Sequence, residues 1–135
     1  NHSLSRAIAL INGGYAMYKA IIKIDPKPKP RMTARSKWTV KNRAYLAYQE
    51  ALAWEFDIVP KQPHDLVGDL VLTCSIFSTT NYGDLKNYIA GVEDSLQYSN
   101  VIKNDSQIVE YNKCRLYRRQ KEGRIEVILR PLVGE

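Results

Sequence analysis

The chain has 135 residues and a formal net charge of +6, with 44% hydrophobic and 25% charged residues. This composition excludes a disordered, collagen-like or coiled-coil protein, and the length predicts one domain with its own hydrophobic core. The two cysteines, Cys74 and Cys114, lie in strand-like segments without neighbouring histidines, so we expect neither a disulfide framework nor a zinc site. No apolar run approaches the roughly 18 residues of a membrane span. We therefore expect a cytoplasmic protein that binds no membrane.

The N-terminal segment is interpreted separately from the rest. The apolar run from Ala7 to Ile11 is too short for the core of a signal peptide, and Gly13 and Gly14 interrupt it. Met17 opens a run that is typical of a natural start. We therefore expect residues 1–16 to be an N-terminal extension, either introduced artificially or naturally upstream, and residues 17–135 to form the domain.

The first half of this domain contains a predicted strand, an extended segment and a predicted helix. Residues 18–24 alternate apolar or aromatic side chains with cations, which predicts a strand. The prolines at positions 26, 28 and 30 lack backbone donors, so the segment that follows should be extended and exposed. Apolar residues then recur at helical spacing and predict a helix over residues 40–56.

The second half contains three predicted strands and one helix. Residues 66–77 read as a long strand, and a helix is predicted over 84–98 because its apolar residues recur at steps of four, three and four. Residues 108–117 and 124–129 are strand-like and should form a hairpin across a charged turn. The order β-α-β-α-β-β predicts a single α+β domain with a mixed β-sheet and helices packed on it.

Basic residues are concentrated in two segments. The first, which we call the basic arm (residues 27–43), has no acidic residue and contains Lys27, Lys29, Arg31, Arg35, Lys37, Lys41 and Arg43. The second lies on the predicted hairpin and contains Lys113, Arg115, Arg118, Arg119, Lys121 and Arg124.

The two basic segments favour a polyanionic partner such as nucleic acid. In an extended chain, alternate residues lie about 6 to 7 Å apart, which suits cations that follow a phosphate backbone. Trp38, Tyr45 and Tyr48 are close enough in sequence to stack on bases. The alternative is that the lysines only make the surface more soluble and the aromatic residues belong to the core.

The candidates for chemistry are acidic residues after the long strand: Asp84, Asp94 and Asp105. Asp84, Asn87, Gly91 and Asp94 recur at steps of three, four and three, so they share one helix face and could line the rim of one pocket. Oxygen ligands of this kind suit Mg²⁺ or Mn²⁺. The alternative is that Asp84 caps the helix and Asp105 begins a turn.

Four segments in this order carry a resemblance to a known family. They are Pro26 to Thr33, Gly83 to Asn87, Asp94 to Leu96, and Asn104 to Glu110. Over about residues 18–129 the chain resembles the RusA family of Holliday junction resolvases. The resemblance implies a homodimeric, Mg²⁺-dependent endonuclease that cuts paired strands of branched DNA at four-way junctions, using a carboxylate cluster and a lysine.

Position by position, the resemblance implies that Asp84 and Asp105 hold Mg²⁺, with Mn²⁺ as a substitute and Asp94 in support or as a third ligand. The chain departs from the family pattern at three positions. Lys86 stands where the family has its second metal-binding aspartate, Ala90 stands at its lysine, and Asn104 stands at the first aspartate of DDxQI. Lys86 is one helical turn from position 90, so it could take over the role of that lysine.

The implied catalytic residues are therefore Asp84, Lys86, Asp94 and Asp105. The expected DNA contacts come from the seven cations of the basic arm together with Asn87, Arg115, Arg118 and Arg119. Two alternatives remain at this point: a catalytically weakened junction-binding protein of the same fold, and an unrelated basic module that binds nucleic acid.

Overall fold

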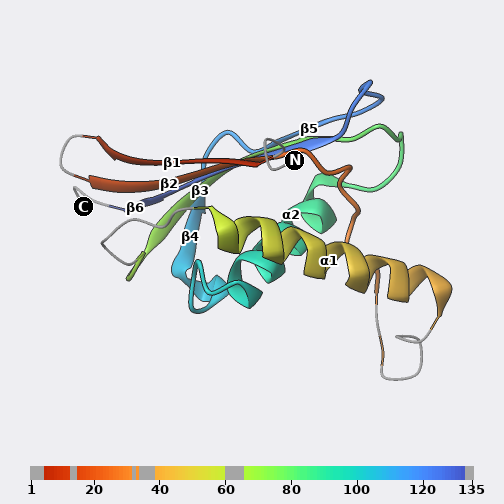
Figure 1. The fold of residues 1–135 in the computed structure, drawn as a ribbon, viewed down its shortest axis with the longest axis horizontal. Helices are drawn as coiled ribbons and strands as arrows, with labels where there is room; N and C mark the ends of the chain where they lie inside the picture. Colours follow the sequence, from red (N-terminus) through yellow and green to blue (C-terminus); the bar gives the residue numbers. More distant parts are fainter. Residues whose placement is uncertain (1–4, 13–14, 32, 34–38, 60–65, 133–135) are drawn as a thin grey trace.

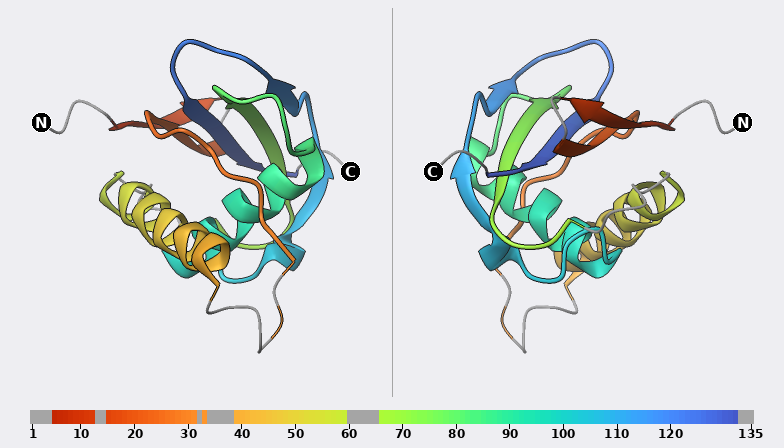
Figure 2. Two further views of the ribbon diagram at one scale, coloured as in Figure 1. Left: turned by 90° about the vertical axis from the view of Figure 1, so that its right-hand side faces the viewer. Right: turned by 90° about the vertical axis from the view of Figure 1, so that its left-hand side faces the viewer.

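The computed structural model describes residues 5–12, 15–31, 33, 39–59 and 66–132 (Figure 1). These residues form one mixed six-stranded sheet and two α-helices, and both helices cover the same face of the sheet (Figures 1 and 2). The predicted α+β class with helices packed on a mixed sheet is confirmed. No helix within these residues is long and apolar enough to cross a bilayer.

The main path of the sheet runs in the order β1-β2-β6-β3-β4, and β5 also pairs with β3. The strands are β1 (Ser5–Asn12), β2 (Tyr15–Ile22), β3 (Leu70–Phe77), β4 (Ile108–Tyr111), β5 (Arg115–Tyr117) and β6 (Arg124–Pro131). The pairs from β1 through β2 and β6 to β3 are antiparallel, whereas β4 and β5 both run parallel to β3. Strand β3 is thus hydrogen-bonded on both sides, and its first three residues are fully buried.

The two helices fill the space above the sheet. Helix α1 (Val40–Ile58) begins at Thr39, whose side chain accepts from the backbone amide of Asn42, and α2 (Leu85–Tyr98) lies between α1 and the sheet edge. The hydroxyl of Tyr18 on β2 donates to the carbonyl of Phe56, which ties α1 to the sheet. The buried apolar side chains between the helices and the sheet make the main stabilising contribution to the fold.

Two aromatic residues of α1 that follow the basic arm belong to the core. Tyr45 and Tyr48 are only 2% and 7% exposed and pack with their rings 5.9 Å apart. The hypothesis that they stack on bases is wrong, because helical spacing turns both side chains into the core. Trp38 lies outside the described residues.

The predicted hairpin between the last two strands is wrong. Strand β3 lies between β5 and β6, so the turn from residue 118 to 123 crosses the end of β3 instead of joining two paired neighbours. The backbone amides of Arg119 and Gln120 donate to the carbonyls of Thr80 and Ser78, which fixes this crossing. The apolar strand β3 forms hydrogen bonds along both edges, with β5 on one side and β6 on the other. This long-range pairing replaces the predicted local pairing of the last two strands with each other.

Other boundaries also differ from the predictions. The first predicted strand lies over residues 15–22, the long strand begins at Leu70 after Gly68 (φ +73°), and residues 108–117 divide into β4 and β5 around Lys113, whose φ is +58°. Strand β1 was not predicted; it pairs with β2 along its whole length. Both cysteines are free, as expected.

Candidate functional site

The loop that leads into α2 is held by contacts from three parts of the chain. Gly83 has a φ of +85°, and a Cβ there would lie 2.9 Å from the Tyr88 ring and 3.0 Å from Pro28. The guanidinium of Arg118 donates to the carbonyls of Asn81 (3.0 Å) and Gly83 (2.7 Å). Arg118, an expected DNA contact, therefore fixes the backbone beside Asp84.

Asp84 is the N-cap of α2. Its carboxylate accepts a hydrogen bond from the backbone amide of Asn87 at 2.9 Å, and its side chain is exposed. The capping interpretation is confirmed, since an N-cap carboxylate satisfies a helix donor that has no partner within the helix. One hydrogen bond leaves most of the acceptor capacity of this carboxylate directed to solvent.

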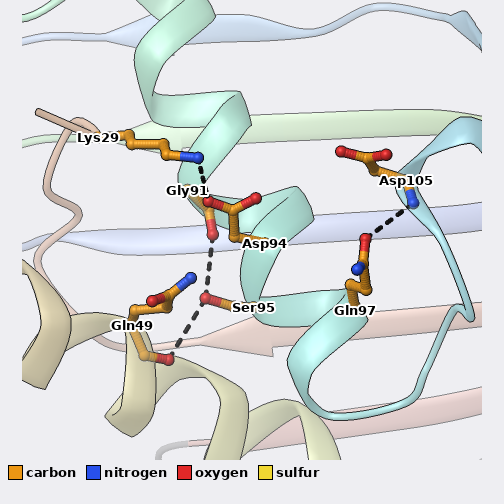
Figure 3. A network of polar contacts seen from close by, with 7 residues as sticks. All are labelled: Lys29, Gln49, Gly91, Asp94, Ser95, Gln97 and Asp105. Carbon is orange, nitrogen blue, oxygen red and sulfur yellow. Dashed lines mark hydrogen bonds and ion pairs between the residues drawn. The ribbon is translucent and has the colours of Figure 1, made fainter. Parts of the chain in front are cut away.

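Asp105 lies at the other end of α2. Asn104 caps a short 3₁₀ turn over Asp105–Gln107, and Gln107 completes a capping box with it. The backbone amide of Asp105 donates to Oε1 of Gln97 in the last turn of α2 (Figure 3). The Asp105 side chain is exposed, so its position is fixed through the backbone and its carboxylate stays accessible. The interpretation that Asp105 begins a turn is also confirmed.

Asp94 and Glu93 lie on α2 near this end. The Lys29 ammonium is 2.6 Å from the Asp94 carboxylate (Figure 3), and the Tyr111 hydroxyl donates to Glu93. Burial raises the pKa of Glu93, and the charges of Asp105 and Asp94 raise it further, while the bond from Tyr111 and the charge of Lys29 oppose this. Three carboxylates therefore share one electrostatic environment here.

The structure does not bring Asp84 together with Asp94 and Asp105 within one chain. Helix α2 has 14 residues, and at 1.5 Å per residue it separates its two ends by about 20 Å. Within the described residues, no group of three His, Cys, Asp or Glu side chains is arranged to hold a metal ion. Mg²⁺ nevertheless needs only one or two protein carboxylates when substrate phosphates and water complete its shell. The exposed Asp84 and Asp105 fit that requirement as separate donors.

The start of the basic arm lies along α2 instead of projecting into solvent. The backbone amide of Lys29 donates to the carbonyl of Asn87 at 3.0 Å. A Cβ on Gly91 would lie 3.0 Å from the Tyr45 hydroxyl and 3.7 Å from the Lys27 carbonyl. Because Gly91 has no side chain, α1 and the start of the basic arm can both pack closely against α2 at this position. The face shared by Asp84, Asn87, Gly91 and Asp94 is thus partly covered and does not form the rim of one pocket. The pairing of Lys29 with Asp94 gave no signal in the sequence.

The remaining predicted residues divide by exposure. Lys27, Arg31, Lys41, Arg43, Lys86 and Arg119 are exposed, whereas Arg35 and Lys37 lie outside the described residues. The guanidinium of Arg115 lies 4.6 Å above the Tyr117 ring. Arg124 lies over Phe77 and pairs with Glu126, so it contributes to the sheet surface. Ala90 is partly buried.

Comparison with known families gives one match. A family model described as endodeoxyribonuclease RusA matches residues 22–130, which include the start of the basic arm, both ends of α2 and the last strands. A comparison with curated proteins finds no match.

Proposed function

The chain belongs to the RusA endodeoxyribonuclease family, and from this premise we propose that it is a Mg²⁺-dependent endonuclease that resolves four-way (Holliday) DNA junctions. The observation that carries the proposal is the pair of exposed carboxylates on Asp84 and Asp105. The Asp84 carboxylate accepts from the Asn87 amide at the start of α2, and the backbone amide of Asp105 donates to the Gln97 side chain in the last turn of α2. Fixed carboxylates beside a basic surface are suited to phosphodiester hydrolysis.

In this proposal Asp84 and Asp105 hold the divalent cation, with Mn²⁺ as a substitute for Mg²⁺. A bound cation of this kind lowers the pKa of an attacking water and polarises phosphate oxygens. The protein's own contribution is to fix the two carboxylates and to offer cations to the negatively charged phosphate. Lys86 is exposed and is the second residue of α2, so its ammonium can reach a phosphate held at Asp84.

Asp94 is proposed as a supporting residue. Its carboxylate is paired with Lys29, so it anchors the basic arm on α2 and offers less charge to a metal ion. This side chain thereby couples the phosphate-binding segment to the helix that presents Asp84.

A homodimer would complete the site and match the symmetry of the substrate. A two-fold interface can bring the Asp84 of one protomer to the Asp105 of its partner, which would join two donors that do not form one cluster within a single chain. Two such sites would cut two strands of a junction symmetrically. Two copies carry a formal charge of +12, twice the +6 of one chain, and this favours association with DNA.

Cleavage of a synthetic four-way junction tests the proposal. The protein should cleave the junction with Mg²⁺ or Mn²⁺, should not cleave it in EDTA, and should prefer it over linear duplex of equal length in a competition gel shift. Equal competition by the duplex would instead favour a basic binding module.

A second candidate, a junction-binding protein with weakened catalysis, follows from Lys86 and Ala90, which replace a family carboxylate and a family lysine. In that case the natural chain binds the junction without cutting it, and the double variant Lys86→Asp with Ala90→Lys creates activity. For an active enzyme in which Lys86 has taken over the lysine role, Lys86→Asp alone abolishes cleavage and the double variant restores it.

The basic arm gives a separate prediction about binding. If Lys27, Lys29 and Arg31 neutralise phosphates, replacing all three with Ala should flatten the slope of log affinity against log salt by about 2 to 3 units. Affinity measured across a salt series by fluorescence anisotropy checks this. The matched control is a double Ala variant of Lys23 and Lys103, two exposed lysines outside both basic segments, which should change the slope less. An unchanged slope in the arm variant would contradict the role of the arm.

A further inference from the structure

A groove of about 370 Å³ lies between the start of the basic arm, the first turns of α1 and the loop before α2. Four cationic side chains line it, Lys27, Lys29, Arg31 and Lys41, and none of the described residues that line it is acidic. The volume falls within the range of sites that hold a small organic group. Its charge is complementary to a phosphate.

An aromatic side chain stands at the edge of this groove. Tyr82 lines it and is 61% exposed, which is high for a tyrosine in a domain with a well-filled core. The backbone around it is fixed, because the Tyr88 hydroxyl donates to the Tyr82 carbonyl and Arg118 holds the carbonyls of Asn81 and Gly83. These bonds fix the backbone that carries the ring, and the exposed ring surface is available for stacking.

A buried hydroxyl borders the same groove. Tyr45 lines it, is 2% exposed, and has a hydroxyl without a hydrogen-bond partner among the described residues. Buried polar groups are normally paired, so an orphaned hydroxyl needs an explanation. The hydroxyl itself lies against Gly91 of α2, so the Tyr45 ring forms part of the apolar wall of the groove.

We propose that this groove binds one unpaired nucleotide of a DNA strand, with its phosphate among the lysines and its base stacked on Tyr82. A paired base inside a duplex has both faces stacked on its neighbours, whereas an unpaired base offers one face to an aromatic side chain. The inference rests on the proposed function and adds the feature of the substrate that is recognised. Because Gly83, which also lines the groove, directly precedes Asp84, the nucleotide would lie beside one of the proposed metal-binding carboxylates.

The test measures binding of a labelled thymidine oligonucleotide and of a duplex of equal length by fluorescence anisotropy in EDTA. Tyr82→Ala should weaken binding of the single strand about 5- to 150-fold, the equivalent of one lost base stack, and leave duplex binding unchanged. Tyr82→Phe should bind both like the natural chain. The matched control is Tyr98→Ala, since Tyr98 is 67% exposed at the far end of α2 in a groove that contains Glu50 and Asp57.

Each outcome decides the inference. Unchanged single-strand affinity in Tyr82→Ala, or an equal loss on the duplex or in Tyr98→Ala, would overturn it. Far-ultraviolet circular dichroism confirms that each variant is folded. If Tyr82→Ala weakens single-strand binding but the natural chain cleaves no junction, only the endonuclease proposal is overturned. If the natural chain cleaves junctions but Tyr82→Ala leaves single-strand binding unchanged, only this inference is overturned.

Discussion

Asp84→Asn should reduce Mg²⁺-dependent junction cleavage by at least about 100-fold while junction binding is kept. The substitution removes the charge that a hard cation requires. It keeps the N-cap, because the asparagine oxygen can still accept from the Asn87 amide and Asn caps helices about as well as Asp does. Single-turnover cleavage and a gel shift in EDTA measure the two properties separately.

The companion variant Asp84→Ala separates catalysis from stability. It should also abolish cleavage, but it should lower the free energy of unfolding by about 1 kcal/mol because the cap is lost. Cleavage by Asp84→Asn at the rate of the natural chain would remove Asp84 from the mechanism.

Mixing two inactive variants tests whether the site is shared between protomers. In a heterodimer of Asp84→Asn with Asp105→Asn, a shared site leaves one of the two sites with both carboxylates, so single-strand nicking should return. If each site lies within one chain, both sites lack a carboxylate and the mixture stays inactive. The separation of Asp84 and Asp105 along α2 favours the first result.

Gly123→Ala should lower the free energy of unfolding by about 3 kcal/mol, through overpacking. A Cβ at position 123 would lie 2.4 Å from the Asp25 Cα and 2.5 Å from its carboxylate oxygen, so backbone would have to move. That carboxylate accepts from the amide and the hydroxyl of Thr79, which joins the segment before the basic arm to the loop after β3. Thermal unfolding should show a midpoint lower by roughly 10 °C.

Gly68→Ala is the matched control for this prediction. Gly68 has a φ of +73° but nothing lies within 4 Å of the position of its Cβ, so only backbone strain opposes the substitution. We expect a loss of about 1 kcal/mol. If Gly123→Ala lowers the free energy of unfolding by no more than Gly68→Ala does, the backbone around Asp25 must move aside at little energetic cost, and the overpacking prediction is wrong.

The sequence by itself determined the elements whose signal is local. Helix α2 lies where apolar residues recur at helical steps, and Asp84 caps it as its position before that stripe predicts. Helix α1 extends only two residues past its predicted end. The motif spacing that resembles RusA was also sufficient to find the family, since order and spacing along the chain need no tertiary information.

Only the tertiary structure decided how distant segments meet. Strand-like residues on either side of a charged turn favour a hairpin locally. In the structure, however, β3 separates β5 from β6, because the backbone of this apolar strand forms hydrogen bonds along both of its edges. The contact of Lys29 with Asp94 depends on the path of the basic arm across α2, which no periodicity encodes. The predicted helix over 84–98 already placed Asp84 at its start and Asp105 beyond its end. The hydrogen bond that brings Asp105 back to Gln97 on α2 came only from the structure.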